Sequence, residues 1–269
     1  MQKSPPITPV ILTLNEDPNI GRTLDALRWA RRVVIVDSGS SDRTEEIARS
    51  YGNVAWYTRA FDCHAAQWSH AVRETMVDTD WVLALDADMV VSPGFVRELE
   101  ESFLRKSYSG GIVPFRYFTG GRELLGSLYP PDLRVFRPEK IRIDQIGHSQ
   151  RFSVEGETYC FRSRIFHDDR KPLGRWVKAQ LDYALLEHGR MSSDHPVGLK
   201  FSLRRLGLLP LIAGIAAYAR AGGPLKGYAA VQYAYERLTF ESLLALQLLR
   251  ERAVRLEVSA SRIEVKENR

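Results

Sequence analysis

The 269-residue sequence contains only two cysteines, Cys63 and Cys160. Two are too few for the disulfide framework that stabilises small secreted proteins. The first residues, Met-Gln-Lys-Ser-Pro-Pro, include no apolar segment of the kind that a signal peptide needs. We therefore expect a chain that folds around an apolar core in a reducing, cytoplasmic compartment.

Long hydrophobic runs are also lacking. The longest, residues 206–219, is shorter than the roughly 20 residues that cross a bilayer. We therefore do not expect a lone membrane-spanning helix. Low-complexity tracts and internal repeats are absent, and 44% hydrophobic with 26% charged residues excludes a disordered chain.

Acidic residues are fewer than basic ones, 33 against 38, which gives a formal net charge of +5. The sequence pI is about 9.2. An excess of positive charge suits an anionic partner such as a nucleotide or a phospholipid surface. We do not expect a nucleic-acid partner, because the basic residues are dispersed and no recognisable reading element gathers them.

Apolar, β-branched segments alternate with helical patterns over residues 1–105, which predicts βαβ units and a mostly parallel sheet. The strands are expected at residues 7–14, 33–36, 54–57 and 81–85. Further strands are expected at 110–118, 133–136 and 159–167, and helices from 173, over 200–220 and over 225–255. We predict one α/β domain over 1–195, with a ligand-binding half (1–105) and an acceptor-facing half (106–195), followed by a helical extension over 196–269.

Two carboxylates, Asp86 and Asp88, follow the apolar strand Trp81–Leu85 directly. Residues two apart at the end of a strand point to the same side, and open α/β sheets bind ligands at this edge. Two carboxylates that close repel each other unless a cation joins them, and Mg²⁺ or Mn²⁺ takes such ligands together with substrate phosphates. The alternative is an Asp that caps the helix beginning near Pro93.

Polar residues also end the two preceding strands. Asn15 and Glu16 follow the first strand, and Asp37 ends the second, just before a run of small residues and a helix start. This pattern suits a nucleotide, whose phosphates bind helix N-termini and whose base or ribose pairs with an acidic side chain. An ordinary tight turn with a capped helix is the alternative for Asp37.

Three segments, taken together and in order, carry a resemblance. Residues 10–16 (VILTLNE), 34–44 (VIVDSGSSDRT) and 83–89 (LALDADM) resemble the successive signatures of family-2 glycosyltransferases. The resemblance implies the GT-A fold, a Rossmann-like α/β architecture with helices on both faces of the sheet. It also implies a hexosyltransferase-like enzyme that moves a sugar from a nucleoside-diphosphate sugar with inversion at the anomeric carbon.

The resemblance assigns roles by motif position. It implies that Asn15 and Glu16 lie near the nucleoside, that Asp37 holds the base, and that Asp86 serves the ribose. It further implies that Asp88 binds the metal, Mg²⁺ or Mn²⁺, at the donor diphosphate.

The segment around Gln67 departs from the family pattern. Many relatives have a basic residue and then Asn after this glutamine, where this chain has Trp68 and Ser69. Gln67 remains a candidate for donor binding, but the departure leaves the identity of the sugar open.

A second group of residues lies in the segment His-Asp-Asp-Arg from His167 to Arg170. Inverting members of the family carry an acidic pair before a helix, one of which takes the proton of the acceptor hydroxyl. By this resemblance Asp169 is the first choice for the base and Asp168 the second. Physically, such a displacement needs one base near the nucleophile. We also predict His167 as a metal ligand and Arg170 as a contact of the diphosphate. The alternatives are a helix cap, a structural histidine and a solvated basic helix face.

The C-terminal region bears on the acceptor. Three basic residues between 200 and 205 precede the apolar run, and tyrosines follow it. This arrangement suits a segment lying on an anionic membrane surface. A helical hairpin packed on the first domain, or a dimer interface, is the alternative. Residues 222–227 (GGPLKG) resemble those of bacterial lipopolysaccharide-core and envelope glycosyltransferases, which implies a lipid-linked or glycan acceptor.

We therefore predict a metal-dependent, inverting glycosyltransferase peripheral to the inner face of the plasma membrane. Two other functions share the expected fold. A sugar-nucleotide nucleotidyltransferase would use the same metal chemistry, and a non-catalytic binding protein would retain the fold without the reaction.

Overall fold

A computed structural model describes residues 5–147, 149–194 and 197–267. The chain forms two compact units, Met1–Lys171 and Pro172–Arg269. The division expected from the sequence, near residue 195, lies at the C-terminal end of helix α5 (Leu173–Asp194), which belongs to the second unit.

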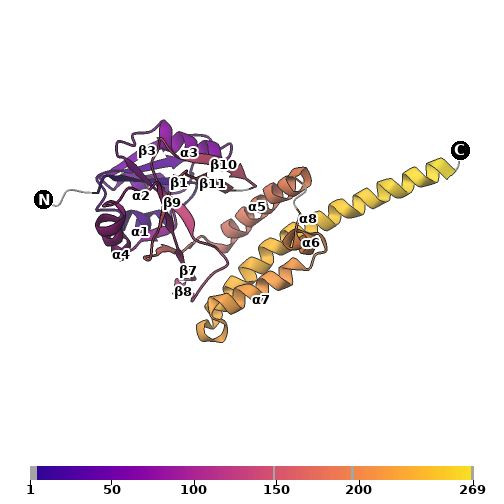
Figure 1. The fold of residues 1–269 in the computed structure, drawn as a ribbon. Coiled ribbons are helices and arrows are strands. Elements are labelled where there is room, and N and C mark those ends of the chain that lie inside the picture. Colours follow the sequence, from indigo (N-terminus) through magenta and orange to yellow (C-terminus); the bar gives the residue numbers. More distant parts are fainter. Residues whose placement is uncertain (1–4, 148, 195–196, 268–269) are drawn as a thin grey trace. The chain divides into compact units, whose positions relative to one another are not determined.

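A seven-stranded sheet with the order β12-β6-β9-β4-β1-β2-β3 forms the centre of the first unit (Figure 1). Its strands are β1 (Ile7–Thr13), β2 (Val33–Asp37), β3 (Val54–Thr58), β4 (Trp81–Asp86), β6 (Gly110–Val113), β9 (Asp132–Phe136) and β12 (Thr158–Cys160). Strands β1 to β4 run parallel to one another, and β9 lies antiparallel between β4 and β6. The predicted α/β fold with a mostly parallel sheet is confirmed.

Helices cover both faces of this sheet. They are α1 (Ile20–Asp25), α2 (Thr44–Arg49), α3 (His64–Arg73), α4 (Pro93–Glu98) and the π-helix η1 (Leu99–Phe103). Trp81, Leu83 and Leu85 of β4 pack with α1, α4 and η1, whereas Val82 and Ala84 pack with α3 on the opposite face (Figure 1). Because side chains alternate along a strand, an unbroken apolar strand must be buried on both faces.

A four-stranded sheet, β5-β13-β7-β8, adjoins the main one. Its strands are β5 (Met89–Val91), β7 (Phe115–Thr119), β8 (Arg122–Glu123) and β13 (Ile165–His167). The strand predicted over 110–118 is divided into β6 and β7 at Pro114, since proline has no N–H for the ladder. The hairpin of β10 (Arg142–Ile146) and β11 (Ser149–Ser153) is mostly polar and was not predicted.

The second unit is helical, as predicted for the C-terminal extension. After α5 it contains α6 (Leu199–Arg205), α7 (Leu209–Ala221), the 3-10 helix η2 (Gly223–Lys226) and α8 (Tyr228–Glu267). The helix predicted over 200–220 is two helices, because Gly207 adopts a left-handed φ of +72° and Pro210 starts the next helix. Within the described residues, no helix has both the length and the hydropathy needed to cross a bilayer.

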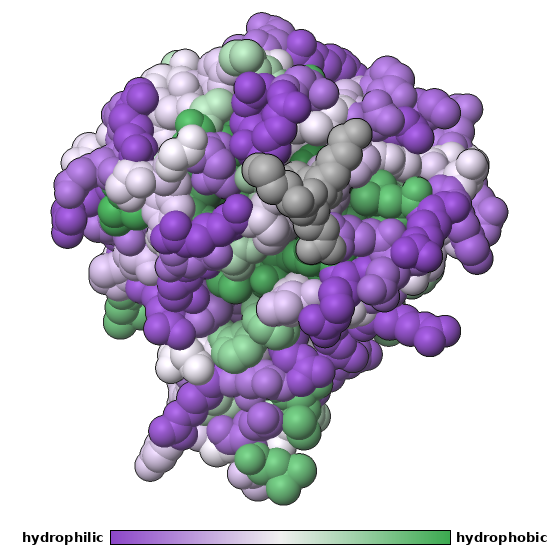
Figure 2. Space-filling model, turned by 90° about the vertical axis from the view of Figure 1, so that its left-hand side faces the viewer, coloured by the Kyte–Doolittle hydropathy of each residue, from purple (hydrophilic) through white to green (hydrophobic). Residues whose placement is uncertain are grey.

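Figure 2 views the molecule from the left of Figure 1. Hydrophilic side chains cover most of the visible surface, and apolar ones lie between them in smaller groups. This distribution is expected when the apolar residues of the strands are buried between sheet and helices.

Candidate active site

Strand pairing brings Asp86, Asp88 and His167 together at the carboxyl end of β4. Asp86 ends β4, and Asp88 lies in the turn before β5. Strand β13 pairs antiparallel with β5 and places His167 opposite Met89, so its ring lies beside Asp88. One ligand atom from each of the three residues lies within 4.8 Å of the others.

Asp88 has the environment of a metal ligand. It is 7% exposed, and burial raises the pKa of its carboxyl because the charged form loses hydration. Its Oδ2 lies 3.7 Å from His167 Nε2, while its buried Oδ1 has no hydrogen-bond partner among the described residues. A buried carboxylate oxygen without a donor is unfavourable unless a cation fills that role. The two carboxylates and the imidazole therefore fit a divalent ion such as Mn²⁺ or Mg²⁺.

The alternative role for Asp86 and Asp88, as helix caps, is excluded. The side chain that caps α4 is Ser92, whose hydroxyl accepts a hydrogen bond of 3.1 Å from Phe95 N–H. The carboxylates are thus not required to begin this helix.

Two neighbours hold this group in place. The His167 ring stacks on Tyr117 with centroids 4.6 Å apart. Arg134 of β9 is buried, with its guanidinium 3.6 Å from Asp86 and 3.2 Å from Asp132. Sequence analysis missed Arg134, although a single arginine inside the otherwise apolar strand 133–136 is a signal of a buried charge with a function.

Asp37 and Asn15 shape the turn that follows β2. Asp37 is buried and accepts hydrogen bonds from the Thr13 hydroxyl (2.9 Å) and from the N–H groups of Gly39 (2.8 Å) and Ser40 (2.7 Å). Asn15 has a left-handed φ of +56°, and its N–H donates to the Ser40 hydroxyl. These bonds join the ends of β1 and β2 into one ordered loop.

Gln67 is fully buried and supports the same edge from α3. Its amide donates to the Ser38 hydroxyl and to the Arg59 carbonyl, both at 3.1 Å, and accepts from Arg59 Nη1 at 2.6 Å. Trp68, where the sequence departs from the family pattern, is buried in the core against Phe152. The departure therefore alters packing behind the site.

Three side chains, those of Glu16, Asn19 and Lys171, form a network around Asp169. Lys171 Nζ lies 2.8 Å from Glu16 Oε1 and 3.3 Å from Asp169 Oδ1. Buried Asn19 donates through Nδ2 to Glu16 and to Asp169, both at 2.9 Å. This network joins the loop after β1 to the segment after β13.

The network also sets the charges of its members. Burial raises the pKa of Glu16 to about 7. Burial opposes ionisation of Asp169 too, but Lys171 and Asn19 outweigh it and hold the pKa of this carboxyl below its usual value. For Lys171, burial is outweighed by the surrounding carboxylates, which raise its pKa and keep it protonated.

Asp168 lies in a different environment from its neighbour. Its Oδ2 accepts from Arg22 Nη1 (2.8 Å) and from Nε (2.9 Å) and Nη2 (2.7 Å) of Arg170. Its side chain is 7% exposed, against 25% for Asp169. Two guanidinium groups therefore fix Asp168 Oδ2, while its Oδ1 is buried without a hydrogen-bond partner among the described residues. No described residue donates a hydrogen bond to Asp169 Oδ2 either, but this carboxylate is less buried.

The predicted site residues thus form three neighbouring groups in the first unit. They are the metal-ligand group Asp86, Asp88 and His167; the network group Glu16, Asp168, Asp169 and Arg170; and the turn group Asn15, Asp37 and Gln67. The first two groups touch, since Asp168 N–H donates to the Asp88 carbonyl at 3.1 Å. Sequence analysis missed Asn19 and Arg22, because Asn19 resembles a helix cap before α1 yet caps nothing and bonds across the fold.

Comparison with known proteins gives consistent results. LpsC of Rhizobium meliloti (strain 1021), a lipopolysaccharide core biosynthesis glycosyltransferase, is 30% identical over 150 residues, which cover 52% of this chain and 53% of LpsC. An uncharacterized glycosyltransferase of Rickettsia bellii (strain RML369-C) is 35% identical over 98 residues, 36% of this chain and 32% of that protein. The alignments thus span about half and about a third of these relatives.

Residues 1–349 of S. aureus TarS, solved in complex with UDP-GlcNAc, superpose with a TM-score of 0.52 at 11% identity, covering 91% of both chains. This likeness concerns the fold and confirms the predicted GT-A architecture. The sequence model described as Glycosyl transferase family 2 matches residues 8–167, more than half of the chain. Every predicted site residue lies within that match except Asp168, Asp169 and Arg170, which follow it directly. The chain therefore belongs to glycosyl transferase family 2.

Proposed function

We propose that the protein is an inverting glycosyltransferase that moves a sugar from a nucleoside-diphosphate sugar to a lipid-linked or cell-envelope glycan. The observation that carries the proposal is Oδ1 of Asp88, which has no hydrogen-bond partner among the described residues and lies beside Asp86 and His167, at the sheet edge next to Asp169. A cation site next to a reachable base is what a single displacement on a diphosphate donor requires.

Donor binding is assigned to the ends of β1, β2 and β4. Asn15, Glu16 and Asp86 would contact the nucleoside, and Asp37 would hold the base or order the turn that meets it. The UDP-GlcNAc complex of TarS supports a nucleotide-sugar donor. Gln67 is buried, so it would act by orienting Arg59, with which it shares two hydrogen bonds.

Asp88, Asp86 and His167 would hold Mg²⁺ or Mn²⁺. When bound, the cation neutralises charge on the donor diphosphate and on the departing nucleoside diphosphate. Arg170 would add a positive charge near the diphosphate, because its side chain remains 48% exposed while bonded to Asp168.

Asp169 is the proposed base. Its carboxyl is held ionised by Lys171 and Asn19, and its Oδ2 accepts no hydrogen bond from the described residues. In the reaction, the acceptor hydroxyl gives its proton to Asp169 while its oxygen forms a bond to the anomeric carbon. The bond from that carbon to the diphosphate breaks, and the nucleoside diphosphate leaves with the bonding electrons. Asp168 suits this role less well, because two guanidinium groups occupy its Oδ2 and its Oδ1 is buried.

The acceptor is assigned from the relatives and the C-terminal helices. LpsC is named for lipopolysaccharide core biosynthesis, which favours an envelope glycan built on a lipid. We place the protein on the inner face of the plasma membrane, where nucleotide sugars and lipid-linked glycans meet.

The test is release of nucleoside diphosphate from a panel of nucleotide sugars, with Mg²⁺, with Mn²⁺ and with a chelator. We expect one donor to be hydrolysed slowly in a metal-dependent way and Asp169→Asn to stop transfer. Asp80→Asn is the matched control, because Asp80 is exposed and precedes β4 at the strand's opposite end. Pyrophosphate release from a sugar phosphate and a nucleoside triphosphate would instead show a nucleotidyltransferase, and no donor binding with any metal would show a non-catalytic protein.

A further inference from the structure

Residues 197–235 of the second unit carry positive charge without any acidic residue. The basic residues are Lys200, Arg204, Arg205, Arg220 and Lys226. These five equal the net charge of the whole chain, +5, so the remainder of the protein is balanced. The segment includes α6, α7, η2 and the start of α8. Arg204 is buried and paired with two glutamates outside the segment, so the other four residues carry the positive charge that attracts anionic surfaces.

The same segment exposes large apolar side chains. We call this surface the hairpin face, and it consists of Leu211, Ile215, Leu225, Tyr228 and Tyr235. These residues are 64–85% exposed. Leu211 and Ile215 are four residues apart on α7, and the two tyrosines are seven apart on α8, so each pair lies on one side of its helix. Apolar residues gathered on one side of two helices indicate a surface that contacts something other than water.

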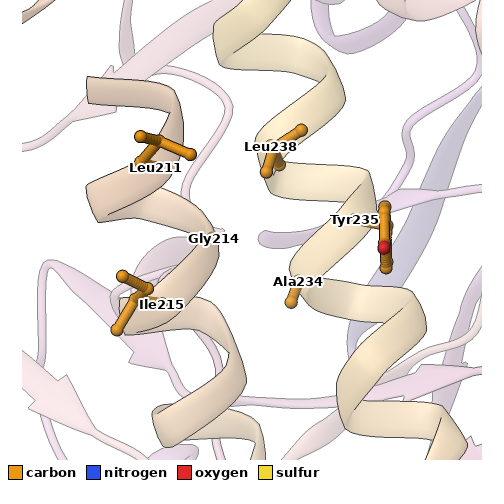
Figure 3. A pocket seen from close by; sticks show the side chains of 6 residues that line it. All are labelled: Leu211, Gly214, Ile215, Ala234, Tyr235 and Leu238. Carbon is orange, nitrogen blue, oxygen red and sulfur yellow. The ribbon is translucent and has the colours of Figure 1, made fainter. Parts of the chain in front are cut away.

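A shallow groove runs between the two helices of the hairpin face (Figure 3). It has a volume of about 180 Å³ and is lined by Leu211, Gly214, Ile215, Ala234, Tyr235 and Leu238. Gly214 and Ala234 face each other across it, and a Cβ on Gly214 would lie 3.4 Å from Leu238 Cδ1. The two helices approach closely at these small residues, and the side chains that line the groove between them are almost wholly apolar.

Two basic residues lie on the same elements as this apolar surface, although helix spacing places Arg220 on the other side of α7 from Leu211 and Ile215. Arg220 is exposed in the last turn of α7, and Lys226 lies in η2 beside Leu225. Arg204 differs, since it is buried and bonded to Glu187 (3.0 Å) and Glu241 (2.7 Å), which fix α6 against α5 and α8. Arg220 and Lys226 therefore supply positive charge from the hairpin itself, whereas the charge of Arg204 is paired.

We propose that the hairpin face binds an anionic phospholipid surface, with α7 and the start of α8 lying along the plane of the membrane. Leucine and isoleucine side chains enter the acyl boundary, tyrosines lie at the headgroup level, and Lys226 contacts lipid phosphates. Arg220, on the other side of α7, adds attraction to the anionic surface within the Debye length. A second copy of the chain fits less well, because a two-fold interface places the same surface against itself and would bring these positive charges together with no acidic partner. The inference deepens the proposed function by naming its membrane partner, and it rests on that function only for the use of a lipid-linked acceptor.

The test is co-sedimentation of the full chain with phosphatidylcholine vesicles, with and without phosphatidylglycerol, in the absence of donor. We expect binding that requires phosphatidylglycerol and weakens with salt. Leu211→Gln/Ile215→Gln should reduce the vesicle partition coefficient more than tenfold. Arg220→Gln/Lys226→Gln should reduce it about fivefold for each charge removed.

Leu246→Gln/Leu249→Gln is the matched control. Both leucines are exposed on α8 (54% and 43%), but they lie between Glu241 and Glu251 and outside the hairpin face. We expect this variant to bind vesicles like the unaltered protein. None of these variants replaces a buried side chain, so circular dichroism and donor hydrolysis should be unchanged.

Three results would overturn the proposal. The unaltered protein could bind equally well to vesicles without phosphatidylglycerol, or the control variant could lose as much vesicle binding as Leu211→Gln/Ile215→Gln. The unaltered protein could also fail to bind vesicles and instead form a dimer that Leu211→Gln/Ile215→Gln dissociates. Vesicle binding needs no turnover, and donor hydrolysis needs no vesicle. Failure of this inference is thus distinguishable from failure of the proposed function.

Discussion

Asn19 is the residue on which the geometry around Asp169 depends most. It is fully buried, and its amide makes four hydrogen bonds. It donates to Glu16 and Asp169 at 2.9 Å each, and accepts from Arg22 Nη2 (2.8 Å) and from the Arg170 N–H (2.9 Å). Asn19→Ala removes all four and leaves the partly buried carboxylates of Glu16 and Asp169 each short of a donor.

The expected loss follows from the partners. A hydrogen bond between neutral groups contributes about 1 kcal/mol and one to a charged group about 1.5–3 kcal/mol. Three of the four partners of Asn19 are charged, but the bonds share one side chain and do not add fully. We therefore expect Asn19→Ala to lower the free energy of unfolding by about 3–5 kcal/mol, against the roughly 5–15 kcal/mol of a typical domain.

The measurement is urea unfolding followed by tryptophan fluorescence. Four of the five tryptophans, Trp29, Trp56, Trp68 and Trp81, lie in the first unit, so the signal reports mainly on the unit that contains Asn19. Sugar transfer is measured in parallel, and we expect it to fall by more than about tenfold, since Asp169 is no longer positioned.

Asn53→Ala is the matched control. Asn53 donates to the carbonyls of Leu27 (3.2 Å) and Ala30 (2.9 Å), both neutral and outside the site. Its replacement should lower the free energy of unfolding by about 1–2 kcal/mol and leave transfer unchanged. If Asn19→Ala lowered stability no more than Asn53→Ala, or left transfer intact, the role given to the network would be refuted.

Three further predictions concern the neighbouring carboxylates. Asp88→Asn should reduce donor hydrolysis by about 100-fold or more and abolish stabilisation by added Mn²⁺. Measured in chelator, it should not lower the free energy of unfolding, because it removes a buried charge. A clear loss of stability in chelator would contradict the proposed metal site. Asp169→Asn should reduce transfer by about 100-fold or more while Asp168→Asn mainly lowers the melting temperature, and the reverse order would exchange their roles. In chelator, the free energy of unfolding of the unaltered protein relative to Glu16→Gln should fall by up to about 3 kcal/mol as the pH rises from about 5 to 7. The reason is that the native pKa of Glu16, about 7, exceeds the unfolded value of 4.5, so the native state binds an extra proton in this range. A difference that stayed constant with pH would exclude this linkage.

Local sequence was sufficient for the first half of the fold. Unbroken apolar runs can be satisfied only between two helical layers, so β2 and β4 lie where they were predicted. Mixed polar strands carry no such signal, which is why the hairpin of β10 and β11 was missed. The helix break at Gly207 was missed for a related reason, since a left-handed glycine differs from a helical one only in its backbone angles.

The sequence by itself determined which carboxylates reach the site edge. Parallel strands end on the same side of a sheet, so the motifs at Asp37 and Asp86 were expected at one edge, where β1 separates their strands. Tertiary structure decided which distant segments join them. The pairing of β5 with β13 sets His167 beside Asp88, and Asn19 bonds to Asp169, 150 residues later in the chain.

Tertiary structure also gave two adjacent carboxylates different surroundings. Asp168 and Asp169 precede the same helix, and only the family resemblance ranked Asp169 first. Two guanidinium groups meet Asp168 Oδ2 and its Oδ1 is buried, whereas the Lys171 ammonium and the Asn19 amide hold the less buried Asp169 through Oδ1 alone. The charge, solvation and reach of a carboxylate depend on neighbours that only the folded chain brings together.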